Sequence, residues 1–166
     1  MRDKKLEFSG KYYACLALLE DETAKLYEKL INRCEKDLAK LLLLNILYET
    51  KKHKELLVYI ANLKGCVYPP ITEECEKEAG SLIKDSLEDV RILKLQIEQS
   101  RSIIDVLRHL INFEKSISEE YLIMIHGEIL KHSEDNPAVR EVLKYVAEDE
   151  KRHINLLNLA CELLNE

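Results

Sequence analysis

The chain has 166 residues, of which 46% are hydrophobic and 34% charged, with only 4 Gly, 3 Pro and no Trp. This length suits one domain over 1–166 that buries a core without disulfide staples, and the composition favours an all-α fold over strands or disorder. The net charge of -6 comes from interspersed acids and bases. Without a basic patch, neither nucleic acid nor a membrane is expected as a partner.

Two stretches in the first half have the spacing of amphipathic helices. Apolar residues recur at helical intervals from about residue 6 to 34, and again from about 37 to 64. The polar break Glu35–Asp37 between them is so short that the two helices must lie antiparallel. A helix pair is therefore predicted over 6–64.

Polar side chains interrupt the apolar stripes of both helices. Glu20 stands where an apolar residue is due in the first helix, and Glu49 and His53 do so in the second. The rest of the second stripe is expected to comprise Leu38, Leu42, Asn45, Ile46, Leu56, Leu57, Ile60 and Leu63. We therefore expect polar groups inside this helix pair at mid-length.

A crossover is predicted over 65–101. Gly65–Pro70 ends the second helix with a glycine and two prolines, and Thr72 has the character of a new N-cap. The helical pattern that follows is broken at Gly80–Ser81 and at Asp85–Ser86. One or two short helices are expected to travel the length of the domain.

A second helix pair is predicted over 102–164. Ser102 begins a run that reaches about residue 133 and carries Glu114 in its stripe, and Pro137 restarts the helix at a first helical position. The stripe of this last helix consists of Val139, Leu143, Val146, Glu150, His153, Leu157, Ala160 and Leu164. The expected fold is all-α, with two antiparallel helix pairs joined by a long crossover.

Glu150 and His153 occupy positions in this last stripe that should be purely apolar. Burying a carboxylate with no partner costs several kcal/mol. The two residues lie one helical turn apart, so their burial predicts a cation, a metal ion or a hydrogen-bonded network beside them.

The two halves of the chain resemble each other. Glu20 and Tyr27 are seven residues apart, as are Glu114 and Tyr121, and each pair is followed by a helix with a histidine at mid-length. A duplicated helix pair related by a pseudo-twofold axis is the simplest interpretation. The residues that would then converge at mid-bundle are Glu20, Glu49, His53, Glu114, Glu150 and His153.

With these residues the chain resembles the ferritin-like, rubrerythrin-related di-iron carboxylate proteins. That family has a Glu on the first and third helices and a Glu-x-x-His on the second and fourth. Glu20, Glu114 and the Glu150–His153 motif match the pattern. In the second helix Thr50 replaces the Glu, and Glu49, which shares a helix face with the histidine four residues later, is the candidate substitute.

The resemblance implies a ferritin-like four-helix bundle and a role for each residue. Glu20 and Glu114 would bridge two metal ions. His53 and His153 would each bind one ion, and Glu150 would serve the ion bound to His153. Around these ligands, the set Tyr27, Tyr121 and Thr50 would form an outer layer. The tyrosines either orient carboxylates through their hydroxyls or simply pack in the core.

Oxygen and imidazole ligands suit two iron ions, with Mn or Zn as alternatives. The resemblance implies reaction with dioxygen or peroxide, or metal handling, in a homodimer with which the Leu41–Leu44 run is compatible. Ile117 stands where rubrerythrins add a further Glu, and no rubredoxin-like domain follows, so an external electron donor would be needed. The alternative, which Thr50 favours, is a metal-poor, non-catalytic helical scaffold that acts through oligomerisation or a protein partner.

The N-terminus and the cysteines predict a cytoplasmic protein. Met1–Lys5 leads into a mixed-charge segment rather than an apolar signal sequence. Five cysteines, an odd number without a CxxC motif, argue against a secreted disulfide framework and a zinc ribbon. Mostly free thiols are expected, although Cys66 and Cys75 could pair in a protein from a hyperthermophile.

Overall fold

Four long helices form the body of the protein in the computed structural model, which describes residues 10–78, 80–99, 102–126 and 136–166. Within these ranges the chain is helical and contains no strand, so the all-α prediction is confirmed. The long helices are α1 (Gly10–Arg33), α2 (Asp37–Leu63), α5 (Ile103–His126) and α7 (Pro137–Asn165). The first residues of the predicted 6–34 helix and the end of the run expected to reach 133 lie outside the described residues.

Local signals in the sequence account for the helix ends. The Asn136 side chain accepts a hydrogen bond from the Ala138 backbone N–H at 2.9 Å, and Pro137 takes the first helical position of α7, as predicted. After α2, Gly65 adopts a positive φ of 78°, the left-handed conformation that commonly terminates a helix.

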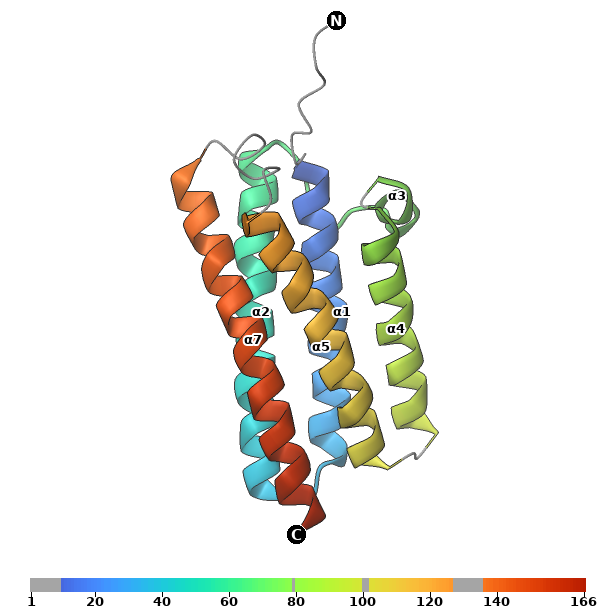
Figure 1. Ribbon diagram of the computed structural model, residues 1–166. Helices are drawn as coiled ribbons and strands as arrows, with labels where there is room; N and C mark the ends of the chain where they lie inside the picture. The colour runs from blue at the N-terminus through green and yellow to red at the C-terminus, as the bar shows by residue number, and fades with distance from the viewer. Residues whose placement is uncertain (1–9, 79, 100–101, 127–135) are drawn as a thin grey trace, which may run out of the picture.

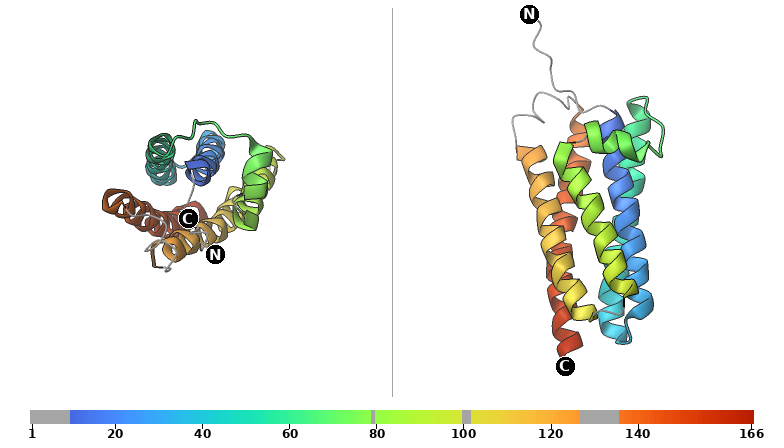
Figure 2. Two further views of the ribbon diagram at one scale, coloured as in Figure 1. Left: turned by 90° about the horizontal axis from the view of Figure 1, so that it is seen from above. Right: turned by 90° about the vertical axis from the view of Figure 1, so that its right-hand side faces the viewer.

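The helices are arranged as two antiparallel pairs, α1 with α2 and α5 with α7 (Figure 1). Seen end-on, the α1/α2 pair lies across from the α5/α7 pair (Figure 2). Helix α2 also packs against α7. The polar residues at mid-length of all four helices are therefore directed toward a common interior.

The crossover consists of α3 (Thr72–Glu78) and α4 (Gly80–Glu98), and α4 packs along α1 and α5. It runs the length of the bundle before α5 begins (Figure 1). The break predicted at Gly80–Ser81 adjoins residue 79, which lies outside the described residues, and α4 begins at Gly80. The break predicted at Asp85–Ser86 is wrong, because α4 is continuous there and Ser86 is buried. Burial of one face of α4 overrides the local helix-breaking signal.

A disulfide between Cys15 on α1 and Cys75 on α3 corrects the expectations for the cysteines. Their Cα atoms lie 5.4 Å apart across a sequence separation of 60 residues, whereas Cys66 keeps a free thiol. The suggested Cys66–Cys75 pairing is therefore wrong, whereas the expectation of mostly free thiols is confirmed, because Cys34, Cys66 and Cys161 are free. The packing of α3 against α1, which sequence spacing does not reveal, selects the partner.

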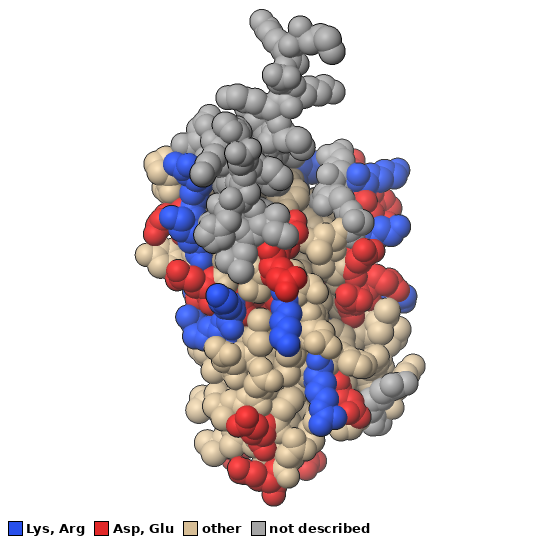
Figure 3. Space-filling view, viewed as in Figure 1, with Lys and Arg blue, Asp and Glu red and all other residues tan. Residues whose placement is uncertain are grey.

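Disulfides persist in oxidising compartments and inside hyperthermophiles, so a cytoplasmic location stays a prediction. Among the described residues, no helix combines the length and the apolar character needed to cross a membrane. On the face shown in Figure 3, basic and acidic side chains are interspersed rather than gathered by sign.

The inward face of α7 is as predicted, but that of α2 is not. Leu38 and Leu63, both placed inside by the sequence pattern, are each 64% exposed. The buried residues of α2 are Ala39, Leu43, Ile46, Leu47, Thr50, His53, Leu57, Ile60 and Ala61. This register places Thr50 squarely inside and Glu49 at the edge of the buried face.

Candidate metal centre

Five side chains from the four long helices form a polar cluster at mid-bundle. They are Glu20 on α1, His53 on α2, Glu114 on α5, and Glu150 and His153 on α7. None of them exposes more than 5% of its surface. All five were predicted site residues, and the structure brings them together.

The cluster divides into two groups that share Glu150. One group contains Glu20, His53 and Glu150, and the other contains Glu114, Glu150 and His153. In each group the candidate ligand atoms all lie within 4.8 Å of one another. Glu150 Oε1 is 2.9 Å from His53 Nδ1, and Glu150 Oε2 is 3.4 Å from His153 Nδ1.

This division changes the roles that the resemblance implied. Glu150 was expected to serve only the metal at His153, but its two oxygens face both imidazoles. Glu20 and Glu114, the expected bridges, each belong to one group only. The geometry therefore makes Glu150 the bridging candidate and the other two glutamates the candidates for one metal each.

Three buried atoms of the cluster have no hydrogen-bond partner: His53 Nδ1, His153 Nδ1 and Glu150 Oε1. The 2.9 Å separation between His53 Nδ1 and Glu150 Oε1 does not have hydrogen-bond geometry. Nearly all buried polar atoms in proteins have a partner. A cation in each group would satisfy these atoms, one beside His53 Nδ1 and Glu150 Oε1 and the other beside His153 Nδ1.

The opposite nitrogen of each imidazole is held by a carboxylate from the other helix pair. His53 Nε2 lies 2.9 Å from Asp149 Oδ2, and His153 Nε2 lies 3.0 Å from Glu49 Oε2. A carboxylate accepts a hydrogen bond, so Nε2 carries the proton and the Nδ1 lone pair of a neutral imidazole faces the cluster. This is the tautomer that metal binding through Nδ1 requires.

Glu49 is therefore placed differently from its prediction as a ligand. It lies outside both groups, and its carboxylate orients His153 instead of reaching a metal beside His53. Asp149, which the sequence prediction missed, does the same for His53. Each of the two acids precedes by one residue the position where the pattern calls for a glutamate, at Thr50 and at Glu150.

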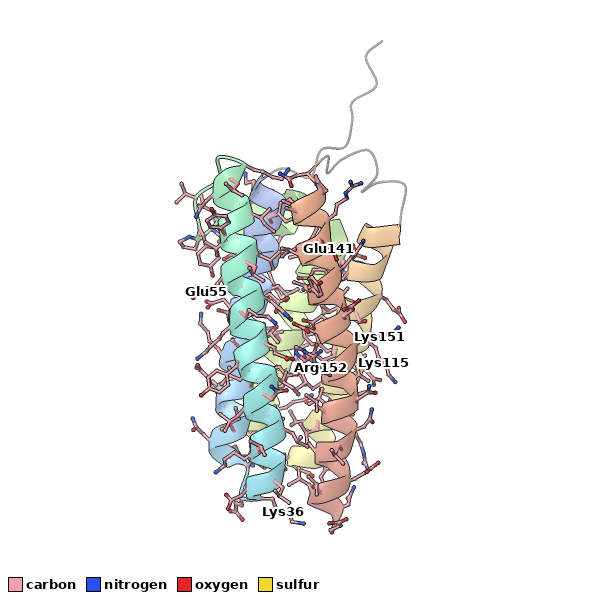
Figure 4. All side chains as sticks on the ribbon, turned by 90° about the vertical axis from the view of Figure 1, so that its left-hand side faces the viewer. Lys36, Glu55, Lys115, Glu141, Lys151 and Arg152 are labelled. Atoms are coloured by element: carbon pink, nitrogen blue, oxygen red, sulfur yellow. A yellow bond between two sulfur atoms is a disulfide. The ribbon has the colours of Figure 1, made fainter. Side chains whose placement is uncertain are left out.

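Two basic residues hold these outer carboxylates in place. Lys52 Nζ lies 2.6 Å from Asp149 Oδ2, and Arg152 contacts both Glu49 Oε1 at 2.5 Å and Asp149 Oδ1 at 2.6 Å. Figure 4 shows Arg152 between α2 and α7. Although burial alone would raise it, Lys52 and His53 lower the pKa of Asp149 to about 2, so its carboxylate stays ionised.

The two tyrosines cross the interior between the helix pairs. Tyr27 on α1 donates to Glu114 Oε1 at 2.5 Å, and Tyr121 on α5 donates to Glu20 Oε1 at 2.9 Å. Burial and the neighbouring carboxylates raise the pKa of both hydroxyls well above the ordinary value. Of the two alternatives, orienting a carboxylate and packing in the core, each tyrosine does both.

Thr50 does not contact the ligand atoms through a hydrogen bond. Its hydroxyl donates to the Ile46 carbonyl of its own helix at 3.0 Å, and the side chain lines a small cavity beside Glu20, Glu114 and Glu150. Thr50 therefore leaves a gap in the polar cluster and does not orient any of the candidate ligands.

Without a metal, the cluster balances its charge with protons. Burial, with the nearby Glu150 charge, raises the pKa of Glu20 to about 8 and that of Glu114 to about 7. Burial would lower the pKa of each histidine, but the carboxylates raise His53 to about 9 and His153 to about 11. Bound metal ions would take over the positive charge that these protons supply.

The charge of Glu150 follows from its position between two imidazoles. Burial alone would raise its pKa, yet His153 and His53 hold the pKa of Glu150 well below the usual range. The two rings stack with centroids 5.8 Å apart. Glu150 is thus the carboxylate that stays ionised at the centre of the cluster.

Each helix of the predicted duplication has its own constant offset from its counterpart in the other half. Glu20 and Glu114 are separated by 94 residues, as are Tyr27 and Tyr121. Between α2 and α7 the separation is 100 residues, and it relates Glu49 to Asp149, Thr50 to Glu150, Lys52 to Arg152 and His53 to His153. The hydrogen bonds and ion pairs described above follow the same correspondence, so Thr50 is the departure from it among the residues of the cluster.

No protein family, curated protein or solved structure matches this chain. The functional argument therefore rests on the chemistry and geometry of the cluster.

Proposed function

We propose that this is a ferritin-like protein whose buried cluster binds two metal ions, with iron as the preferred candidate. The protein then acts in dioxygen or peroxide chemistry or in metal handling. The observation that carries the proposal is the set of three buried atoms without a hydrogen-bond partner, His53 Nδ1, His153 Nδ1 and Glu150 Oε1. A hydrogen-bonded core would have paired them, whereas a metal site leaves its ligand atoms free.

The helix arrangement supports this assignment. Ferritin-like di-iron proteins carry a Glu on each of two helices and a Glu-x-x-His on each of the other two, all projecting into a bundle with one crossover connection. Here α1 and α5 supply Glu20 and Glu114, and α7 supplies Glu150 and His153. Helix α2 supplies only the histidine of its motif, His53.

The donor set defines the metals that fit. Carboxylate oxygens and imidazole nitrogens suit iron and manganese, and zinc competes on affinity. The two candidate groups contain no thiolate. Iron held here would supply the electrons for reducing dioxygen or peroxide, and an external electron donor would be needed to restore them.

The protein's own residues would fix the ligands and exclude water. Asp149 and Glu49 set the tautomer of the two imidazoles. Tyr27 and Tyr121 keep their protons and donate to Glu114 and Glu20, which orients one oxygen of each carboxylate. Because the cluster is almost wholly buried, only small reactants would reach it without a movement of the helices.

Metal content tests the proposal directly. Protein loaded anaerobically with Fe(II) and then desalted should retain about two equivalents of iron by elemental analysis. A His53→Gln/His153→Gln double variant should retain almost none, whereas His109→Gln, which alters an exposed histidine of α5, should match the wild type. If the wild-type protein retained well under one equivalent of iron, the result would contradict the proposal.

Reaction with oxidants then separates redox chemistry from metal handling. The Fe(II)-loaded protein is mixed with dioxygen or with hydrogen peroxide, and iron oxidation is followed by absorbance. Oxidation faster than that of free Fe(II) supports a redox role. Retained iron that is oxidised no faster than free Fe(II) contradicts that role and favours metal handling.

The second candidate function is a metal-poor helical scaffold. Thr50 favours it, since one expected ligand is lost, and the raised pKa values of Glu20 and Glu114 show how protons can balance the buried charge. Zn(II) at a hundred times its Kd would raise the melting temperature by about 5–10 °C if the metal site exists. An unchanged melting temperature with metal or with a chelator would favour the scaffold.

A further inference from the structure

A small cavity lies on the pseudo-twofold axis of the cluster. It is lined by four pairs of residues that the duplication relates: Leu19 and Phe113, Glu20 and Glu114, Thr23 and Ile117, and Thr50 and Glu150. Leu19, Phe113 and Ile117 form the apolar part of its wall, and the remaining residues form the polar part. The fourth pair combines a carboxylate with a threonine, so the cavity lies where the symmetry of the ligands is broken.

The threonine hydroxyls in the wall are already occupied. Thr50 donates to the Ile46 carbonyl at 3.0 Å, and Thr23 donates to the Leu19 carbonyl at 2.8 Å. The other polar side chains that line the cavity are the three carboxylates of the cluster, Glu20, Glu114 and Glu150. The cavity therefore borders residues of both candidate metal-binding groups.

The size of the cavity restricts what can enter. Its volume is about 10 Å³, close to the roughly 10–15 Å³ that one water molecule requires. A glutamate at position 50, in the place that Glu150 holds in the other half, would fill this space and supply a second bridging carboxylate. Threonine leaves both the space and the coordination position open.

We propose that the cavity beside Thr50 receives the small oxidant, dioxygen or peroxide, at the metal centre, and that Thr50 determines this access by being shorter than the expected glutamate. The inference rests on the proposed function and adds to it the entry face and the residue that opens it. On this interpretation the missing ligand is a binding position for substrate and not a sign of a decayed site.

Nitric oxide, a diatomic analogue of dioxygen, is the probe. Its binding to the Fe(II)-loaded protein is titrated by visible absorbance, and iron content is measured on the same samples. Thr50→Glu and Thr50→Leu, which fill the space with a polar and an apolar side chain, should bind nitric oxide at least about tenfold more weakly than wild type. Thr50→Val, which keeps the size and removes the hydroxyl, should bind it as the wild type does.

Each outcome has one meaning. Iron-loaded Thr50→Glu or Thr50→Leu protein that binds nitric oxide as tightly as wild type overturns the cavity proposal and leaves the metal centre intact. If Thr50→Glu does not fold, Thr50→Leu decides the question, because Thr50 supplies no ligand atom and its loss should not change iron content. Wild-type protein without iron overturns the proposed function itself, and this inference with it.

A second inference concerns the outer face of α2. Its exposed large apolar residues are Leu38, Leu41, Tyr48, Tyr59 and Leu63, each more than 60% exposed. With the exposed residues Asn45, Lys52 and Glu55, they form a stripe that recurs at intervals of three and four residues, the spacing of a helix that packs against another helix. The matching face of α7 carries Glu141 and Glu148 in place of Leu41 and Tyr48.

In its central part, from position 41 to position 59, the order of residues along this stripe is self-complementary. If two α2 helices pack antiparallel about a twofold axis at the level of residue 50, position 41 meets 59, 45 meets 55, and 48 meets 52. Leucine then faces tyrosine, asparagine faces glutamate, and tyrosine faces lysine, so no like charges are opposed along the stripe. We infer that a second copy of this chain covers the face.

The oligomeric state tests this inference. Sedimentation should show a dimer for the wild type and a monomer for Leu41→Glu/Tyr48→Glu, which installs the residues that α7 carries. The control Leu159→Glu, at an exposed apolar residue of α7, should stay dimeric. A wild-type monomer at micromolar concentration, or a dimer that survives the double substitution with helix content unchanged, overturns the inference.

Discussion

The two halves of the cluster, one from α1 and α2 and the other from α5 and α7, are alike in every ligand but one. Each contributes a glutamate, a histidine and a tyrosine in the same register, yet Thr50 stands opposite Glu150. Thr50 thus removes one carboxylate from the His53 half. Because Glu150 faces both imidazoles, each group nevertheless contains three candidate ligands, so one carboxylate could serve two metals.

Removal of the shared carboxylate should have the largest effect. Glu150→Gln keeps the shape of the side chain but removes the charge common to both groups, so affinity for both metals should fall by at least about a hundredfold. Iron retained after desalting, measured by elemental analysis, should drop from about two equivalents to almost none. Glu148→Gln, on the exposed face of α7, is the matched control.

A variant that still binds one metal tightly would show that Glu150 is not shared. In that case the half that keeps its metal would identify the group that does not need this carboxylate, and the bridging assignment would be wrong.

Substitution of a glutamate that belongs to one group only should remove the metal from that group and leave the other metal bound. Glu20→Gln should lose the metal at His53, and Glu114→Gln the metal at His153, because each residue belongs to one group only. Titration with Zn(II), followed by calorimetry, should therefore show about one site in either variant instead of two. Loss of both metals from a single substitution would contradict the division into two groups.

Substitutions of the outer carboxylates should act across the halves. Asp149→Asn on α7 should weaken the metal at His53, and Glu49→Gln on α2 the metal at His153, each by about 10–100-fold, as for other residues that orient a ligand. Competition with a chelator measures both affinities. Glu141→Gln is an exposed control on α7. If Asp149→Asn weakened the metal at His153 instead, or Glu49→Gln the metal at His53, the hydrogen bonds between α2 and α7 would not control the imidazoles.

The tyrosines should matter least for metal binding. Tyr27→Phe and Tyr121→Phe each remove one buried hydrogen bond, which should lower the free energy of unfolding by about 1–2 kcal/mol. Urea denaturation of the metal-free proteins measures this loss. Equal losses would support equivalent halves, whereas a loss in only one variant would show that the halves differ beyond position 50.

The sequence is a good guide to the helices and to the five candidate ligands that the structure brings together. Helical periodicity, Pro137 and Gly65 set the helix ends, and polar residues in otherwise apolar stripes identify Glu20, Glu114 and His153. Each of these signals is local. They depend on the spacing within one helix, so they can be recognised before any packing is known.

Features that depend on packing between helices were not predictable. The Leu41–Leu44 run places apolar side chains on every face of α2, so the sequence does not define which face is buried. The sequence pattern puts Glu49 in the buried stripe, whereas the structure buries Thr50. Asp149 is buried only because α2 packs against α7. The duplication is the available signal, since the offset of 100 residues that relates His53 to His153 also relates Glu49 to Asp149.

The disulfide constrains the α1/α2 half of the chain and leaves the α5/α7 half without such a constraint. Joining Cys15 to Cys75 closes a covalent ring that contains the whole of α2 and most of α1, whereas α5 and α7 lie on an open tail. Even in an unfolded chain, Glu20 and His53 would stay within one ring, at high effective concentration relative to each other. During folding, Glu20 and His53 would therefore be held close together before Glu114, Glu150 and His153 join them.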